Sequence, residues 1–187
     1  MDTKTALLDS AEAIARQRGF NGFSYADLAA AVGIRKASIH HHFPTKAVLG
    51  QAMMERYRHA FGDALAEIKS SAHSAADRLR NYIELYRNAL QGGKTICLCV
   101  ALSSDRSSLD DATLAEISQF HSASLAWLEN LFDDARLDGS IRNVANSKQE
   151  ATQCLALVEG AQLMAHARAD AEPFDTATAL LLARTNA

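Results

Sequence analysis

The sequence predicts an all-α protein in which a small N-terminal helix-turn-helix precedes a larger helical body. Apolar residues recur at helical spacing along nearly the whole chain of 187 residues. Alanine and leucine, both strong helix formers, are abundant. The chain has only 2 prolines and 9 glycines, which disfavours a β fold with many turns. The spacing of the apolar residues predicts about nine helices.

Three short helices are expected before residue 46. Ser24 begins the second of them, because its hydroxyl can accept a backbone N–H and Asp27 favours the positive end of the helix. Ile39 is the inward-facing residue of the third helix, which covers about residues 34–43. Each helix ends at a residue that stops helices, and these are Gly19, Gly33 and Pro44.

Longer helices are expected in the remainder of the chain. The first of them begins near Thr45. Four more cover about residues 75–90, 96–102, 110–137 and 147–168, and a last helix follows Pro173. The segment 96–102 is wholly apolar and should be buried on all sides, with Thr95 as its candidate cap. We therefore divide the chain into a helix-turn-helix domain, residues 1–46, and a helical body, residues 47–187.

No membrane segment or secretory signal is visible in the sequence. The longest purely apolar run has 7 residues, whereas a helix needs roughly 18 to cross a bilayer. Lys4, Asp9 and Glu12 stand where the apolar part of a signal peptide would have to be. We therefore expect a cytoplasmic protein that does not bind membranes.

Charge is distributed unevenly along the chain. The whole chain carries 19 basic and 22 acidic residues, a net charge of -3. Residues 1–50 nevertheless hold 6 of the basic and 4 of the acidic residues, which gives this end +2 and the remainder -5. A basic end on an acidic body orients that end toward a polyanion and keeps the body away from it.

The basic end contains a helix-turn-helix pattern in residues 24–43. Two short helices, each with one apolar face, are joined by a tight turn at Gly33. In such a pair the start of the second helix contacts base edges in the major groove of DNA. The residues that this predicts as DNA-reading are Arg35, Lys36, Ala37, Ser38, His40 and His41. Lys46, at the start of the next helix, is predicted to contact a phosphate.

The same pattern would also fit a structural three-helix bundle with solvated charges on its outside. The helix from Arg35 to His42 is too short and too polar to be stable by itself, which favours a role in binding. His40, His41 and His42 are consecutive, so their rings point about 100° apart and cannot converge on one metal ion. We expect one of these rings to face the core and two to face DNA, and we predict no metal site.

Residues 18–46 carry four runs in which glycine, aromatic and lysine residues fall in a specific register. The runs are Arg18-Gly19-Phe20, Phe23 to Ala29, Val32-Gly33-Ile34 and Lys36 to Lys46. Together they resemble the TetR family of bacterial repressors over roughly the first quarter of the chain. This resemblance implies an all-α fold, a homodimer on a near-palindromic DNA operator, and a ligand cavity in the C-terminal body.

Carried over by position, the resemblance implies that Ser24 and Tyr25 contact phosphate and that the recognition helix reads DNA. Three positions depart from the family pattern. Arg35 occupies a place often held by a small hydroxyl cap, His40 stands where tyrosine is common, and Ala26 is too short for a base contact sometimes made there. These departures leave the operator sequence unpredicted.

The resemblance also implies a small-molecule pocket and a dimer interface in the body. Core packing alone would explain most of the candidate pocket residues, which are Tyr57, Phe61, Tyr82, Tyr86, Cys97, Phe120, His121 and Trp127. Small and apolar residues of the last two long helices are candidates for the dimer interface, and these are Leu155, Val158, Gly160, Met164 and Leu181. Such a dimer places two recognition helices about 34–36 Å apart, or a multiple of this distance.

The resemblance therefore implies a transcriptional repressor that a small-molecule effector releases from its operator. No Gly-rich phosphate loop, His-Glu-x-x-His or Gly-x-Ser-x-Gly motif is present, so we expect neither an enzyme nor a cofactor. Two other interpretations stay open. One is a helical small-molecule carrier or enzyme with a purely structural N-terminal bundle, and the other is a helical interaction module without a ligand.

Cys97 lies in the first turn of the helix expected at residues 96–102. Packing as a small apolar side chain is the favoured interpretation. The other hypothesis is that the helix dipole favours its thiolate, which would then sense oxidants or electrophiles. Cys97 and Cys99 are two residues apart on this helix, so they are expected to face different ways.

Overall fold

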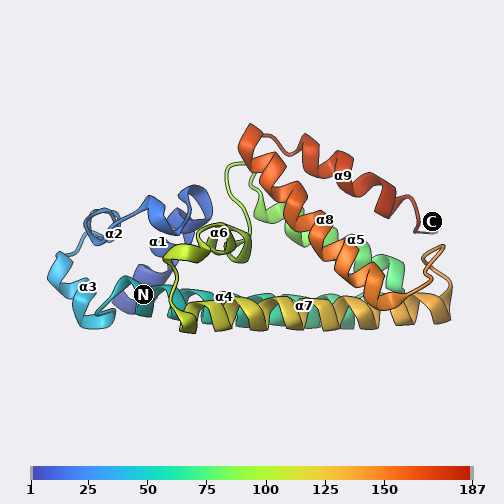
Figure 1. The fold of residues 1–187 in the computed structure, drawn as a ribbon, viewed down its shortest axis with the longest axis horizontal. Coiled ribbons are helices and arrows are strands. Elements are labelled where there is room, and N and C mark those ends of the chain that lie inside the picture. The colour runs from blue at the N-terminus through green and yellow to red at the C-terminus, as the bar shows by residue number, and fades with distance from the viewer. Residues whose placement is uncertain (1, 186–187) are drawn as a thin grey trace. The chain divides into compact units, whose positions relative to one another are not determined.

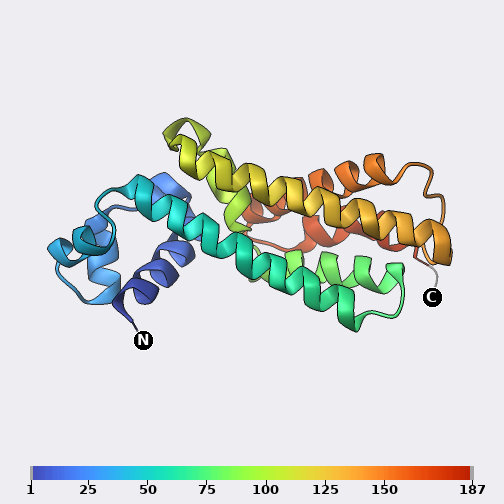
Figure 2. The same ribbon diagram turned by 90° about the horizontal axis from the view of Figure 1, so that it is seen from below.

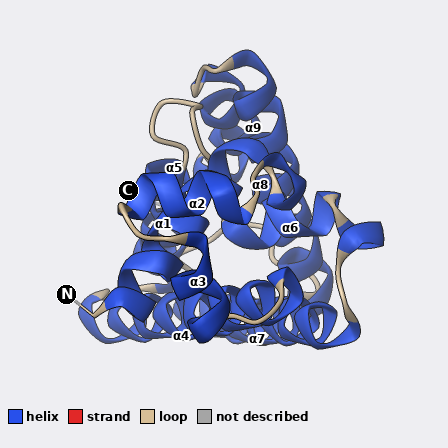
Figure 3. Cartoon of the chain, turned by 90° about the vertical axis from the view of Figure 1, so that its left-hand side faces the viewer, coloured by secondary structure: helices blue, strands red, loops and turns tan. Residues whose placement is uncertain are grey.

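The computed structural model describes residues 2–185, and within them the chain forms nine α-helices and no strand (Figure 1, Figure 3). The all-α prediction is therefore confirmed. The α-helices are α1 (Thr3–Arg18), α2 (Tyr25–Val32), α3 (Lys36–His42), α4 (Lys46–Ser71), α5 (Ala75–Ala89), α6 (Leu98–Ser104), α7 (Asp111–Asp138), α8 (Ser147–Arg168) and α9 (Glu172–Leu182). Two short 3-10 helices are η1 (Phe20–Gly22) and η2 (Arg106–Ser108).

The chain divides into two compact units. The first contains the chain up to His59 together with Leu98–Phe120, and the second contains Ala60–Cys97 together with the chain from His121 onward. α4 and α7 each begin in the first unit and end in the second. The first unit thus includes α6 and the start of α7, while the domain boundary between residues 46 and 47 stays a prediction.

The core of the first unit lies where α1, α2 and α3 meet the start of α4, around the N-terminus in Figure 2. Leu7 of α1, Leu28 of α2, Ile39 of α3 and Met53 of α4 are all fully buried. Each belongs to an apolar stripe at helical spacing, which is why these short helices can form only when they pack together. α6, whose first residues are all buried, packs against α1.

The core of the second unit lies among α5, α8, α9 and the later turns of α7. α8 and α9 run side by side (Figure 1) and bury Val158 and Phe174. Tyr82 of α5 and Phe132 of α7 are also fully buried. The turn after α5 comes so close to the end of α8 that a Cβ atom at Gly93, where φ is +90°, would overlap the backbone of Asp170.

The short apolar helix begins two residues later than expected, at Leu98, so Cys97 precedes α6. Thr95 does not cap α6, because its hydroxyl donates to the Ala89 carbonyl at 2.7 Å. The Cys97 N–H donates to the Oε1 of the buried Gln162 side chain at 2.8 Å. The hydrogen bond from Cys97 to Gln162 joins residues 65 positions apart, so no local pattern reveals it.

None of the helices in the described part of the chain has the length and apolarity that crossing a membrane requires. This agrees with the short apolar runs of the sequence.

Candidate nucleic-acid interface

α2 begins with a complete capping box formed by Ser24 and Asp27. The Ser24 Oγ accepts the backbone N–H groups of Ala26 at 3.2 Å and Asp27 at 3.4 Å. In return, the Ser24 N–H donates to Asp27 Oδ2 at 2.8 Å and its hydroxyl donates to the same oxygen at 2.7 Å. The hydrogen bond from the Ser24 side chain is the largest cause that lowers the pKa of Asp27. Ser24 is exposed, but its hydroxyl is engaged in the cap.

Gly33 makes the turn between α2 and α3. Its φ of 76° and ψ of 32° place it in the left-handed region, where glycine carries no steric penalty. The Gly33 N–H donates to the Ala29 carbonyl at 2.9 Å and closes α2. α3 then begins after Arg35, and no side chain of the described residues caps its start, as the missing hydroxyl residue at position 35 predicted.

α3 has one buried residue and an exposed polar face. Ile39 is fully buried and anchors the helix against the core of the first unit. Six predicted DNA-reading residues are exposed, and these are Arg35, Lys36, Ala37, Ser38, His40 and His41. The helix therefore presents cationic and hydrogen-bonding side chains to solvent on a surface that its own fold leaves uncovered.

The prediction that one of the three histidines faces the core is wrong. His40 and His41 are exposed and His42 is half-buried, while Ile39 is the residue that points inward. The His40 ring lies 5.0 Å from the ring of Tyr25, and its Nδ1 lies 3.2 Å from the Pro44 carbonyl oxygen. Ile39 takes the inward position because it is the apolar residue on that side of a helix of only two turns.

Tyr25 lies inside the first unit rather than on its surface. Its ring is buried, and its hydroxyl donates to the Phe43 carbonyl at 2.9 Å. Burial raises the pKa of Tyr25 to about 12, so this phenol stays protonated and keeps its role as a donor. The hydrogen bond ties the start of α2 to the end of α3 and holds the helix-turn-helix together.

Lys46, the first residue of α4, also points inward. Its Nζ donates to the carbonyl oxygens of Phe20 at 2.5 Å and Phe23 at 2.6 Å. The same ammonium lies 4.7 Å from the ring centre of Phe20 and 4.3 Å from that of Phe23. Burial lowers the pKa of Lys46, while the carboxylates of Asp105 and Asp27 oppose that shift. This ammonium therefore has protein partners that the sequence did not reveal.

Further polar contacts in the first unit were not predicted from the sequence. Arg56 of α4 joins two carboxylates of α1, Asp9 at 2.6 Å and Glu12 at 2.9 Å. The Asn21 N–H donates to Asp105 at 3.1 Å, which links η1 to the segment after α6. These pairs are distant in the sequence, and no residue spacing indicates them.

The structure places the predicted pocket residues in two groups. Tyr57 and Phe120 lie together in the first unit, with ring centres 6.0 Å apart. The other six lie in the second unit, namely Phe61, Tyr82, Tyr86, Cys97, His121 and Trp127. Glu159, whose carboxylate lies 3.3 Å from His121, and Gln162 belong to the same region but were not predicted.

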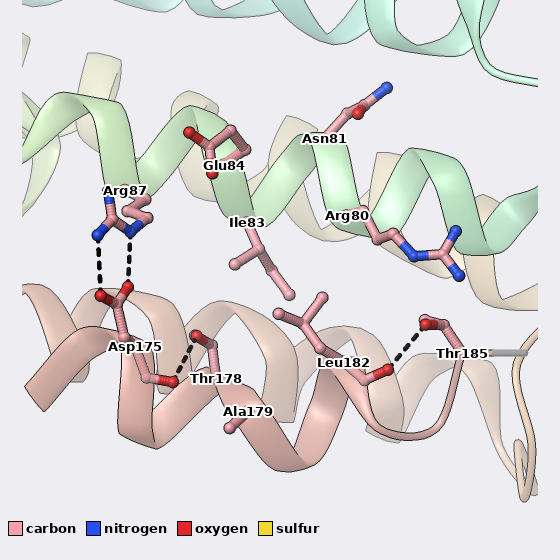
Figure 4. Close-up of a pocket in the computed structure, with 10 residues that line it drawn as sticks. All are labelled: Arg80, Asn81, Ile83, Glu84, Arg87, Asp175, Thr178, Ala179, Leu182 and Thr185. Carbon is pink, nitrogen blue, oxygen red and sulfur yellow. Dashed lines mark hydrogen bonds and ion pairs between the residues drawn. The ribbon is translucent and has the colours of Figure 1, made fainter. Parts of the chain in front are cut away.

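A groove of about 600 Å³ lies between α5 and α9 on the second unit (Figure 4). None of the eight predicted pocket residues lines it. Ile83 and Leu182 line its apolar part, while the Arg87 guanidinium and the Asp175 carboxylate form two parallel hydrogen bonds of 2.7 and 2.9 Å. This pairing raises the pKa of Arg87 and lowers that of Asp175.

The five predicted dimer residues differ in exposure. Leu155, Val158 and Leu181 are buried within their own unit, and Val158 is 0 % exposed. Gly160 and Met164 are exposed on α8, and Met164 is 54 % exposed. The residue with the most exposed apolar side chain on α9 is Leu180, at 81 %, which was not predicted.

Family models match both parts of the chain. The model of bacterial regulatory proteins of the tetR family matches residues 7–53, and that of the tetracyclin repressor-like C-terminal domain matches residues 75–181. The HTH-type transcriptional repressor NemR of Escherichia coli is 29% identical over 181 residues, which are 95% of this chain and 91% of NemR. The HTH-type transcriptional repressor DhaR of Mycobacterium sp. (strain GP1) is 25% identical over 173 residues, 90% of this chain and 85% of DhaR.

Solved structures are similar over nearly the full chain. A TetR-family transcriptional regulator from Agrobacterium tumefaciens has a TM-score of 0.92 at 30% identity and covers 98% of this chain and 97% of its own. The reduced form of E. coli NemR has a TM-score of 0.84 at 28% identity and covers 99% of this chain and 98% of its own. Since the C-terminal model alone matches more than half of the chain, the protein belongs to the TetR family and is a helix-turn-helix transcriptional regulator, not an enzyme.

Proposed function

We propose that this regulator is a homodimeric repressor that inserts α3 into the major groove of its operator and leaves the operator when it binds a small molecule. The observation that carries the proposal is the exposed face of α3, which Ile39 anchors from below. Arg35 and Lys36 offer donors to guanine and phosphate, and Ala37 is small enough to approach the groove or touch a thymine methyl. Ser38, His40 and His41 extend this surface.

Tyr25 and Lys46 act from inside the first unit in this proposal. Both have hydrogen bonds to backbone carbonyls, so we assign them the role of holding α2, α3 and the start of α4 in the orientation that DNA requires. Ser24 contributes through the cap of α2, whose positive end supports a phosphate nearby.

Duplex binding measured by fluorescence anisotropy tests the DNA interface. The labelled DNA is a duplex selected from a random pool, and the titration is repeated over a range of salt concentrations. Lys36→Ala should weaken binding and reduce the slope of log K against log salt by about 0.9 for each phosphate that this lysine neutralises. Lys148→Ala, an exposed lysine at the start of α8, is the matched control and should change neither quantity. Equal effects of both variants, or no duplex binding at low salt, would contradict the proposal.

The exposed apolar side chains of α8 and α9 support the homodimer. Leu163 and Met164 are 44 % and 54 % exposed on α8, beside the small residue Gly160. Leu180 of α9 lines a groove together with Gln153 and Leu157 of α8, so the two helices form one continuous surface. The buried residues Leu155, Val158 and Leu181 support this surface from below rather than contact a partner.

Light scattering after gel filtration measures the oligomeric state. Leu180→Glu combined with Met164→Glu should convert the dimer to a monomer, because two carboxylates would be buried without partners. The monomer should also bind the selected duplex more weakly, since only one half-site can be held at a time. Leu137→Glu is the matched control, because Leu137 is equally exposed but lies at the end of α7. A dimer that persists in the double variant would contradict this interface.

Release by a small molecule requires that the ligand binds the DNA-free conformation more tightly. α4 supports such coupling, because it is one uninterrupted helix that begins in the first unit and ends in the second. A change that a ligand imposes on the second unit can therefore reach the recognition helix through α4.

A further inference from the structure

Two tyrosine hydroxyls in the interior of the second unit lack hydrogen-bond partners. Tyr82 and Tyr86 lie on successive turns of α5 and are fully buried. Within the described residues, neither hydroxyl forms a hydrogen bond of normal geometry, although the two hydroxyls are close enough to affect each other's pKa. Rotation of the two hydroxyls toward each other would satisfy at most one of the two O–H donors. Because buried polar groups are nearly always hydrogen-bonded, this pair requires an explanation.

Two of the neighbouring polar side chains, Gln162 and His166, already form hydrogen bonds elsewhere. Gln162 accepts the Cys97 N–H at 2.8 Å and donates to the Tyr86 carbonyl at 2.7 Å. The His166 ring lies 3.0 Å from the Gly93 carbonyl oxygen. Glu159 carries a carboxylate near the hydroxyls. Its buried Oε1 lies 3.3 Å from His121 Nε2 but makes no hydrogen bond within the described residues. None of these three side chains therefore accepts a hydroxyl proton of Tyr82 or Tyr86.

The surroundings of the two hydroxyls are aromatic. Trp127 stacks on Tyr82 with ring centres 5.5 Å apart and an interplanar angle of 21°. Phe61 meets Tyr86 edge-on at 5.7 Å. His121 and Glu159 keep 32 % and 22 % of their side chains exposed, so solvent reaches this end of the cluster. Mostly apolar walls with a few convergent polar groups are the usual composition of a small-molecule site.

The charges around the cluster disfavour an ionic ligand. Glu159 would repel an anion, and burial together with Glu159 already opposes ionisation of both phenols. A cation would have to compete with His121, because the Glu159 carboxylate raises the pKa of that imidazole and the two groups form an ion pair. A neutral ligand avoids both the repulsion by Glu159 and the competition with His121.

We propose that the hydroxyls of Tyr82 and Tyr86 bind the effector, and that the effector is a small neutral aromatic molecule with an acceptor oxygen such as a carbonyl. The oxygen accepts the phenol protons that the protein leaves unbonded. Its ring packs among Trp127, Phe61 and the tyrosine rings, while a donor group on the ligand can bond to Glu159. This inference rests on the proposed release of the repressor by a small molecule.

The single tryptophan of the chain is Trp127, so tryptophan emission reports directly on this cluster. The full-length protein is titrated with benzamide, benzoate and benzylamine, which share their size but are neutral, anionic and cationic. We expect a saturable change with benzamide at millimolar concentrations, and at least roughly tenfold weaker responses to the two ions. No saturable response to benzamide, or a stronger one to either ion, would overturn the inference.

Tyr82→Phe and Tyr86→Phe identify the groups that bind. Each should weaken benzamide binding by roughly tenfold, the effect of removing one hydrogen bond, without lowering the unfolding temperature. Thr152→Val, which removes a hydroxyl from an exposed position of α8, is the matched control and should bind benzamide normally. A lower unfolding temperature with unchanged binding would mean that the hydroxyls are satisfied within the protein or by buried water, and would overturn the inference. Duplex binding of the same samples separates this outcome from a failure of the proposed function.

Discussion

Replacing Lys46 distinguishes a half-buried structural ammonium from a phosphate contact. The structure gives its Nζ two carbonyl partners at 2.5 and 2.6 Å and two aromatic rings within 4.7 Å. Each hydrogen bond from a charged group contributes about 1.5–3 kcal/mol, and each ring contributes about 0.5–1 kcal/mol. The ammonium also loses hydration, which lowers its pKa and offsets part of this gain. These contacts together contribute about 4–8 kcal/mol before the loss of hydration, so Lys46→Met, which keeps the aliphatic stem, should destabilise the protein by at least about 2 kcal/mol.

Urea unfolding measures this destabilisation, and the salt dependence of duplex binding measures the number of phosphate contacts. Lys46→Met should lower the unfolding free energy while leaving the salt slope of the folded protein unchanged. Lys36→Met is the matched control, since Lys36 is exposed on α3, and it should show the opposite behaviour. Its unfolding free energy should change by less than about 0.5 kcal/mol, while its salt slope falls by about 0.9 for each phosphate that Lys36 neutralises in the parent protein. Unchanged stability with a reduced salt slope in Lys46→Met would refute the reasoning and restore Lys46 as a phosphate contact.

Three further predictions concern α4, α2 and the second unit. Gly62→Ala should stabilise the protein by roughly 0.5–1 kcal/mol in urea unfolding, because nothing lies within 4 Å of the added Cβ. Gly50→Ala in the same helix should destabilise it instead, because its Cβ would lie 2.9 Å from the Phe20 ring. Ser24→Ala should cost about 1 kcal/mol through the cap of α2. Hydrogen bonds lower the pKa of Asp27 in the folded protein. The cap therefore stabilises the protein fully above the ordinary pKa of 3.8, and this contribution is lost as the pH falls through the lower folded pKa. Acid unfolding of Ser24→Ala compared with the parent protein measures this loss. The folded pKa of His121 is raised, so its pairing with Glu159 stabilises the protein below its ordinary pKa of 6.5 and is lost as the pH rises through the folded value. Thermal unfolding of Glu159→Gln across this range should lose that pH dependence, and an unchanged profile would mean that the pair does not couple to folding.

The helices, and most of their ends, were predictable from the sequence because the signals are local, the start of α6 being an exception. A capping box needs only Ser24 and Asp27 three residues apart, and the left-handed turn needs only Gly33. The exposed face of α3 follows in the same way, since Ile39 is its apolar residue and the others are polar or small. The sequence by itself therefore determines the fold class, the order of the helices and the recognition helix.

Only the tertiary structure determines the hydrogen-bond partners of the long polar side chains. Lys46 and Tyr25 were predicted to contact phosphate, yet both donate hydrogen bonds to backbone carbonyls about twenty residues away along the chain. Val158 was expected at a dimer interface but is buried in its own unit. The unbonded hydroxyls of Tyr82 and Tyr86, and Glu159 near them, follow from how α5, α7 and α8 pack. Periodicity determines which face of a helix is apolar, whereas the partner of a polar group depends on which distant segment packs against it.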